Sequence, residues 1–128
     1  MIYIDSSIAL AYLLAEARSP PMRLWQERLT SSALLEFEVW NRVNALGRSA
    51  SLGDAAHALL NRTNLIEMDR PALARALEPW PLPLRTLDGL HLSTMTFLRQ
   101  HGEAIELASY DNRLIAVAQT LGFMLAAL

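Results

Sequence analysis

Residues 1–10 read MIYIDSSIAL, and this stretch decides the fold. Its first four residues are large and apolar or aromatic, and two of them are β-branched, which is typical of a short buried strand. Asp5 ends this run. From Ser6 onward, SSIALAYLLAEA (6–17) has the apolar spacing of a helix. The opening therefore predicts a strand, a carboxylate at its end and then a helix.

The same alternation continues along the chain. Further strands are predicted at 29–32 (LTSS), 64–69 (NLIEMD), 104–111 (AIELASYD) and 123–128 (FMLAAL). Helices are predicted at 20–29, 33–47, 51–63, 70–77, 86–102 and 112–122, with Thr86 and Gly102 as the caps of the fifth of these. Strands that alternate with helices, and that lack polar alternation, indicate a parallel sheet covered on both faces. We therefore predict an α/β fold, a small parallel β-sheet flanked by helices on both faces, as one domain over residues 1–128.

Composition excludes several classes of protein. The chain has 128 residues and no cysteine, so a disulfide scaffold, a thiolate zinc site and a cysteine nucleophile are excluded. A net charge of −2 gives no global attraction to nucleic acid, and all 11 basic residues are arginine. No apolar run reaches the roughly 18–20 residues of a membrane helix, and no basic region precedes the first apolar run. We expect a cytoplasmic protein with no membrane association.

Two acidic residues lie where predicted strands end. Asp5 follows MIYI, Asp111 follows IELASY, and each also begins a predicted helix. In open α/β sheets ligands bind beyond the carboxyl ends of the strands, so both residues are candidates for a site. The structural alternative is helix capping, since aspartate is a favoured N-cap that contributes about 1 kcal/mol.

Two further acids stand in unusual surroundings. Asp88 falls in the first turn of a predicted helix, where it could simply complement the helix dipole. Glu38 lies within the apolar segment ALLEFEVW, where Arg42, four residues on, could neutralise it. Glu36 is about 200° from Glu38 around the helix, and periodicity alone does not say which of the two faces solvent.

If these acids lie close together, their mutual repulsion is unfavourable unless a bound cation offsets it. Two like charges 4 Å apart repel by about 4 kcal/mol at an effective dielectric constant near 20. An all-oxygen set of carboxylates suits Mg²⁺ or Mn²⁺ better than zinc. Such ions activate water and stabilise in-line attack on phosphate.

The histidines form no motif of their own. His57, His91 and His101 have no metal-ligand spacing. His91 shares a helix face with Leu87, Met95 and Leu98, which favours a place in the core. His101, before Gly102, suits the end of a helix, and the chain has no glycine-rich phosphate loop.

Four segments together resemble a known family. MIYIDSSIAL (1–10), SSALLEFEVWNRV (31–43), LRTLDGLHLST (84–94) and LASYDNRLIAVAQTLGF (107–123) look like successive motifs of the PIN domain. More narrowly, they resemble the VapC-type toxins of type II toxin–antitoxin systems. The resemblance covers nearly the whole chain, with the motifs in the family's order and spacing.

The resemblance implies a set of site residues. In that family four acids at the carboxyl edge of the sheet hold Mg²⁺ or Mn²⁺. Carried over by motif, the metal-binding and catalytic residues would be Asp5, Glu38, Asp88 and Asp111. The motif spacing from Ser31 selects Glu38 over Glu36. Ser7 and Ser109 would lie beside the metal pocket.

The resemblance also implies an activity and partners. The protein would be a metal-dependent endoribonuclease that hydrolyses RNA phosphodiester bonds with metal-activated water. Independently of the resemblance, we expect Arg42, Arg85 or Arg113 to contact phosphates. A VapB-like antitoxin would cover the active site, and the toxin would be a homodimer. The abundance of leucine and alanine predicts exposed apolar surface that suits such contacts.

Three other classes of protein are alternatives to this interpretation. A receiver domain needs a lysine beside its acidic pocket, and this chain has none. A haloacid-dehalogenase-type phosphatase has a second aspartate two residues after the first, where this chain has Ser7. The third alternative is a non-catalytic protein-interaction module of α/β fold whose acidic residues serve as helix caps.

Overall fold

The computed structural model of the chain describes residues 1–128 and contains one five-stranded sheet. All four neighbouring pairs of strands are parallel. The strands are β1 (Ile2–Ile4), β2 (Leu29–Ser32), β3 (Thr63–Ile66), β4 (Glu106–Ala108) and β5 (Met124–Leu125). Their order is β3-β2-β1-β4-β5, so the direction in which strands are added reverses between β1 and β4. Such a switch point is where ligands bind in open α/β sheets.

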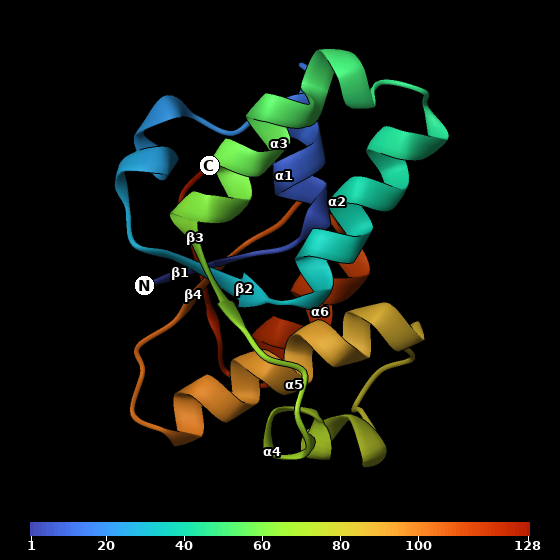
Figure 1. Cartoon of the computed structure of the whole chain (residues 1–128). Helices are drawn as coiled ribbons and strands as arrows, with labels where there is room; N and C mark the ends of the chain where they lie inside the picture. Colours follow the sequence, from blue (N-terminus) through green and yellow to red (C-terminus); the bar gives the residue numbers. More distant parts are fainter.

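Six α-helices and two short 3₁₀ helices connect the strands. The α-helices are α1 (Ser6–Leu13), α2 (Leu34–Ala45), α3 (Ser49–Arg62), α4 (Arg70–Leu73), α5 (Thr86–Gln100) and α6 (Asn112–Thr120). The 3₁₀ helices are η1 (Met22–Gln26) and η2 (Ala74–Leu77). In Figure 1, α1, α2 and α3 lie on one side of the sheet, and α4 and α5 lie on the other.

Adjacent residues of β1 supply the centres of two separate cores, because successive side chains of a strand point to opposite faces. Ile4 packs in the core formed with α1, α2 and α3. Tyr3 packs in the core formed with α5 and α6. Both side chains are completely buried. The predicted α/β fold, with a parallel sheet covered on both faces, is confirmed.

Several element boundaries differ from the sequence prediction. The helix predicted at 20–29 is only the 3₁₀ helix η1, and the segment 70–77 is divided between α4 and η2. Helix α1 ends at Leu13, and Ala15 then adopts a left-handed backbone (φ 49°) that no helix can continue through. Thr86 is not a cap: the residue before α5 is Arg85, whose side chain makes no capping hydrogen bond. Gly102 does follow the end of α5, with a φ of 86° that favours glycine.

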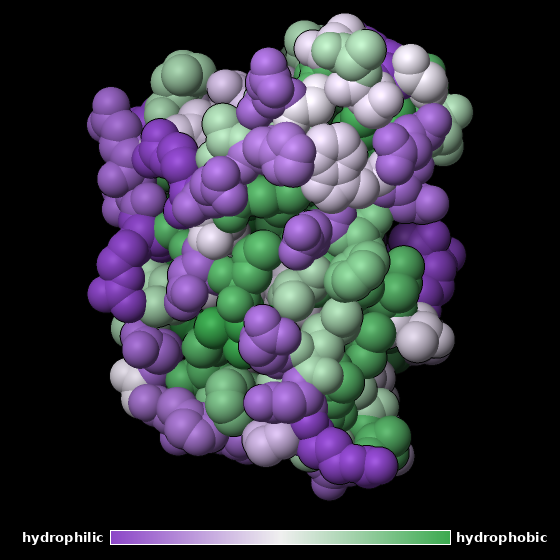
Figure 2. Space-filling model, in the orientation of Figure 1, coloured by the Kyte–Doolittle hydropathy of each residue, from purple (hydrophilic) through white to green (hydrophobic).

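Apolar side chains remain exposed on the surface, as the composition predicts. Phe37, on α2, keeps 64% of its surface exposed, and Leu87, at the start of α5, keeps 48%. Figure 2 shows hydrophobic residues in a broad band across the middle of one face, with hydrophilic residues on either side. None of the helices is both long enough and apolar enough to cross a lipid bilayer.

Truncation of a core leucine tests how much the second core stabilises the fold. Leu92, on α5, is completely buried, whereas Leu77, on η2, is 86% exposed. Leu92→Ala should lower the free energy of unfolding by about 2–5 kcal/mol, because it removes buried methyl groups and leaves a cavity. Leu77→Ala, the matched control, should change it by less than about 0.5 kcal/mol. Urea denaturation followed by circular dichroism measures both values, and equal losses would contradict the assignment of this core.

Candidate active site at the carboxyl edge of the sheet

Two aspartates cap the helices that leave the switch point of the sheet. Asp5 directly follows β1, and its Oδ1 accepts hydrogen bonds from the backbone N–H groups of Ser7 (3.1 Å) and Ile8 (3.4 Å). Asp111 occupies the same position before α6, and its Oδ1 accepts from the N–H groups of Arg113 (3.0 Å) and Leu114 (3.3 Å). The capping function expected for both residues is confirmed. In each carboxylate, Oδ2 accepts no N–H bond from its own helix.

Asp5 is an acid held in the interior by serine hydroxyls. Only 4% of its surface is exposed. Ser7 Oγ donates to its Oδ1 at 2.5 Å, and Ser109 Oγ donates to its Oδ2 at 2.7 Å. Burial raises the pKa of Asp5 above its usual range, and the bonds from these hydroxyls partly offset that rise. Ser7 and Ser109 were predicted to lie beside the site, and both contact its most buried carboxylate.

The same hydroxyls join the two strand ends to each other. Ser7 Oγ accepts from the backbone N–H of Tyr110 at 2.8 Å, and Ser109 Oγ accepts from that of Asp111 at 2.9 Å. Because each hydroxyl both donates and accepts, the loop after β1 and the loop after β4 are fixed relative to each other.

Asp88 and Asp111 face each other across one guanidinium group. Arg85 Nε lies 3.5 Å from Asp88 Oδ2, and Arg85 Nη2 lies 3.5 Å from Asp111 Oδ2. Asp88 Oδ2 is buried and accepts no hydrogen bond. Burial raises the pKa of Asp88, the charge of Asp111 raises it further, and Arg85 opposes both effects. Because the Arg85 side chain is 68% exposed, its charge is screened by water and compensates the two acids only weakly.

Glu38 reaches the site from α2 and contacts both layers of the molecule. Its Oε1 lies 2.5 Å from Nε2 of His91 on α5, and its Oε2 accepts from Ser6 Oγ at 3.2 Å. Glu36, the alternative that helical periodicity left open, is exposed. Arg42 forms no ion pair with Glu38, so the neutralisation predicted from their spacing is wrong. The spacing allowed it, but tertiary packing gives Glu38 a partner from another helix.

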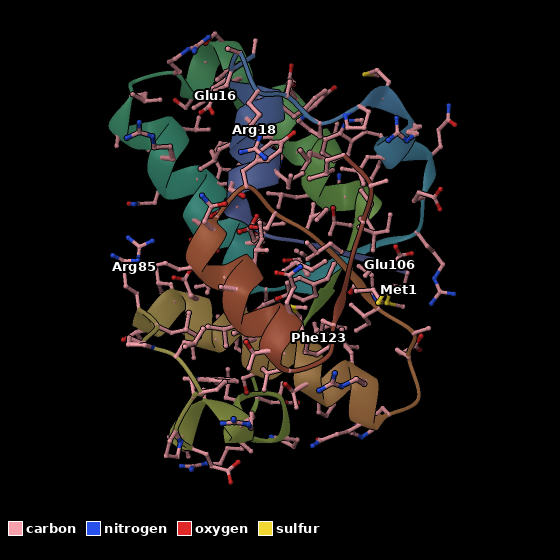
Figure 3. The ribbon with its side chains drawn as sticks, turned by 180° about the vertical axis from the view of Figure 1, so that it is seen from behind. Met1, Glu16, Arg18, Arg85, Glu106 and Phe123 are labelled. Atoms are coloured by element: carbon pink, nitrogen blue, oxygen red, sulfur yellow. The ribbon has the colours of Figure 1, made fainter.

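These side chains surround a cavity of about 400 Å³. Its lining includes Glu38, Asp88 and Asp111, together with Ser6 and Arg85; Asp5, the fourth predicted ligand, is buried and is not part of this lining. Figure 3 shows Arg85 on the side of the molecule opposite Met1 and Glu106, which lie at the amino ends of β1 and β4. The cavity is therefore at the carboxyl edge of the sheet.

The acids approach one another but do not form a ready-made metal cage. No three of the histidine, aspartate and glutamate side chains are arranged so that they could hold an ion together. Each carboxylate instead has an internal partner: serine hydroxyls for Asp5, His91 for Glu38, and Arg85 for Asp88 and Asp111. The donor set, four carboxylates with one buried oxygen that accepts no hydrogen bond, still fits the chemistry of Mg²⁺ or Mn²⁺.

The three arginines predicted to contact phosphate have different positions. Arg85 borders both the acidic cavity and a neighbouring cavity of about 500 Å³, which Arg113 also lines. Arg42 is exposed on α2 and lines neither cavity. Of the three arginines, Arg85 alone lines the acidic cavity, and Arg113 lines only the neighbouring one.

Sequence reasoning missed two residues of the site. It assigned His91 to the core alone. His91 is indeed buried, with 1% of its surface exposed, but it also contacts Glu38. Its position three residues after Asp88 places both on neighbouring faces of α5, and this spacing was the available signal. Ser6 bonds to Glu38 over 32 positions of sequence, a contact that no local pattern indicates.

Comparisons with known proteins give a consistent result. The sequence model of the PIN domain family matches residues 2–120. Ribonuclease VapC46 of Mycobacterium tuberculosis is 33% identical over 129 residues, and the match covers 98% of this chain and 96% of that protein. Ribonuclease VapC47 of the same species is 26% identical, with the same two shares covered. Ribonuclease VapC35, also from that species, is 29% identical, with 99% and 96% covered. No solved structure matches the sequence significantly.

Removing one of the facing charges tests the electrostatics of the site. Folded Asp88 keeps its proton to a higher pH than unfolded Asp88, so the metal-free protein should lose stability as pH rises through the window above the usual aspartate pKa. Asp88→Asn abolishes this loss. The variant should therefore be more stable than the parent at about pH 7, with the gain shrinking toward about pH 3.5, where both states are protonated.

Urea denaturation at the two pH values, without divalent ions, measures this difference. Asp54→Asn, which changes an exposed aspartate of α3, is the control and should show no such gain. A gain for Asp88→Asn that is equal at both pH values would contradict the proposed cause.

Proposed function

Because the chain belongs to the PIN domain family, in its VapC-type branch, we propose that it is a metal-dependent endoribonuclease and the toxin of a type II toxin–antitoxin pair. One observation carries this proposal. Acidic side chains from both layers of the fold face a single cavity at the switch point of the sheet. The names of the curated relatives, all ribonucleases, support RNA as the substrate.

Mg²⁺ or Mn²⁺ would be held by carboxylates of the site: Asp5, Glu38, Asp88 and Asp111. When bound, the ion would lower the pKa of a water molecule and stabilise negative charge on the phosphodiester that this water attacks. The buried Oδ2 of Asp88 supports this assignment: it accepts no hydrogen bond and its one charged neighbour, Arg85, is exposed, so a bound cation would satisfy it better. The raised pKa values of Asp5 and Asp88 support it too: burial disfavours the charged form of both carboxylates, and a bound cation would stabilise that form.

The protein's own groups fix the acids before any substrate arrives. Ser7 and Ser109 hold both oxygens of Asp5, so this carboxylate keeps one orientation. Asp88 and Asp111 lie at helix N-termini, where the positive end of the dipole stabilises their charge. Water can reach the site, because Arg85 and Leu87 line the acidic cavity and both side chains are exposed to solvent.

Arg85 and Arg113 are the proposed phosphate contacts. Both line the cavity beside the acids, and a guanidinium group matches the oxygens of a phosphodiester. In the metal-free chain Arg85 pairs with Asp88 and Asp111, and a divalent ion on those acids would release it to bind the RNA backbone. Arg42 lies outside both cavities, and a contact from it would be limited to more distant phosphates.

We also propose the partners of a VapC-type toxin. Leu87 lines the acidic cavity and is half exposed, and Phe37 is exposed on α2 one residue before Glu38. Apolar side chains at the rim of a charged cavity suit a VapB-like antitoxin that covers the active site. The remaining exposed apolar surface is available for a homodimer contact, and an RNA substrate would place the protein in the cytoplasm.

A second function is favoured by a specific observation. Asp5 and Asp111 are good helix caps, as a non-catalytic interaction module would require. Capping alone, however, does not account for Glu38 or Asp88, because neither lies at an N-cap position.

The substitution Asp5→Asn distinguishes the two functions. Asparagine is as good an N-cap as aspartate, so the fold should remain intact. RNA cleavage in Mg²⁺ should nevertheless fall by more than the roughly 10- to 100-fold that is typical when an outer-shell partner is removed. Mn²⁺ at about 100 times its dissociation constant should stabilise the parent by about 2.7 kcal/mol in a thermal titration, and Asp5→Asn should weaken that response.

Asp69→Asn is the matched control for this experiment. Asp69 is also an N-cap, of α4, where its side chain accepts from Ala72 N–H, but it is exposed and bonds to no residue of the site. If the acids are only caps, the two variants should behave alike. Full cleavage by Asp5→Asn at saturating Mg²⁺ would overturn the assignment.

Arg85→Ala separates binding of RNA from binding of metal. RNA affinity, measured in Ca²⁺ by fluorescence anisotropy, should fall roughly 5- to 100-fold, as for loss of one charged hydrogen-bond partner. Mn²⁺ affinity should stay the same or increase, because the competing cation beside Asp88 and Asp111 is gone. Arg48→Ala, in the exposed loop before α3, is the control. Unchanged RNA affinity in Arg85→Ala would remove Arg85 from the substrate site.

A further inference from the structure

A chain of hydrogen bonds runs from the centre of the sheet to Glu38. The backbone N–H of Ser32 donates to Tyr3 Oη at 3.0 Å, and Tyr3 Oη lies 2.7 Å from His91 Nδ1. His91 Nε2 in turn lies 2.5 Å from Glu38 Oε1. Tyr3 is completely buried and His91 is 1% exposed, so water does not compete for these contacts.

The donors and acceptors fix the direction of this chain. The Ser32 amide can only donate, so Tyr3 Oη accepts from it and has its own proton to give. A tyrosine hydroxyl is protonated at neutral pH, so the phenol keeps that proton. Glu38 Oε1, a carboxylate oxygen, can only accept, which leaves His91 Nδ1 as the acceptor for the tyrosine proton. The imidazole proton is then on Nε2, directed at Glu38 Oε1.

The Glu38 carboxylate is therefore held from two sides. His91 on α5 bonds to Oε1, and Ser6 at the start of α1 bonds to Oε2. A glutamate has three side-chain torsions, and an unrestrained one would lose that freedom when it bound a ligand. Fixing it in advance removes this cost from the binding step.

His91 is not placed to be a ligand itself. Both of its nitrogens already have partners, and it is absent from the lining of the acidic cavity. A purely structural core histidine would need hydrogen-bond partners, but not a functional carboxylate from the opposite helical layer as one of them.

We propose that His91 is a positioning residue for the active site: held by Tyr3 in the tautomer with a proton on Nε2, it orients Glu38 toward the cavity as a metal ligand. This inference rests on the proposed function, because it takes Glu38 to be a ligand of the divalent ion. It adds His91 and Tyr3, which lie in the core and line no cavity, to the residues on which activity depends.

A double-mutant cycle with Mn²⁺ as the probe tests the proposal. Isothermal titration of the whole protein gives Mn²⁺ affinities for the parent, Glu38→Gln, His91→Leu and the double variant. His91→Leu should weaken Mn²⁺ binding roughly 10- to 100-fold, as removal of an outer-shell partner does elsewhere. The double variant should bind no more than about twofold more weakly than Glu38→Gln alone, because His91 acts only through Glu38.

Two more variants separate positioning from packing. His91→Gln keeps an N–H donor near the position of Nε2 and should recover part of the lost affinity. Thr96→Val removes a buried hydroxyl that bonds within α5 to the carbonyl of Leu92, and it should leave Mn²⁺ affinity unchanged. If His91→Leu does not fold, Tyr3→Phe tests the far end of the chain, and it should weaken Mn²⁺ binding only when Glu38 is present.

Each outcome has a defined meaning. Non-additive losses with partial recovery in His91→Gln would support the proposal. Additive losses would overturn the proposal and leave the proposed function standing. The same holds if Glu38→Gln binds Mn²⁺ weakly while His91→Leu keeps the affinity of the parent. If only Tyr3→Phe folds, its affinity takes the place of that of His91→Leu. Unchanged affinity in Glu38→Gln would overturn the ligand assignment in the proposed function, and this proposal with it.

Discussion

Repulsion between carboxylates is the constraint that shapes one end of this molecule. Asp88 and Asp111 share a cavity with Glu38, and Asp5 is buried at the end of β1, outside the lining of that cavity. At an effective dielectric constant near 20, a pair of such charges 4 Å apart costs about 4 kcal/mol, which is comparable to the whole stability of a small domain. The structure meets this cost with serine hydroxyls, helix N-termini, one histidine and one exposed guanidinium group. These partners leave Asp88 Oδ2 without a hydrogen bond and the pKa values of Asp5 and Asp88 raised. A site that stays electrostatically incomplete in this way is suited to a divalent cation.

The sheet makes this convergence possible, because its strand order brings the ends of β1 and β4 together. Ser7 and Ser109 then join the two loops: Ser7 donates to Asp5 and accepts from Tyr110 N–H in the loop after β4, and Ser109, in that loop, donates to Asp5 after β1. Small side chains are needed here, since a larger residue would push the two loops apart. The geometry of the acids therefore depends on residues that carry no charge themselves.

Tyr3 connects the core to the site. Its ring is completely buried among residues of α5 and α6, while its hydroxyl begins the hydrogen bonds that reach Glu38 through His91. Packing and positioning are thus functions of one side chain. Because a close-packed core has few alternative arrangements, a carboxylate tied to it is held more rigidly than one anchored by surface contacts.

The amino-acid sequence by itself determined the alternation of strands and helices, the parallel sheet, and the capping positions of Asp5 and Asp111. These features follow from local patterns: apolar runs of strand length, helical spacing, and a short acceptor side chain at a helix start. Resemblance to the family, rather than periodicity, singled out Glu38, and the exposure of Glu36 agrees with that choice. Only the tertiary structure decided the partners of the acids. Glu38 pairs with His91, 53 positions away, and not with Arg42 on its own helix, while Arg85 bridges two acids 23 positions apart in sequence. Such contacts depend on how the layers pack across the sheet, and no local spacing in the chain encodes that arrangement.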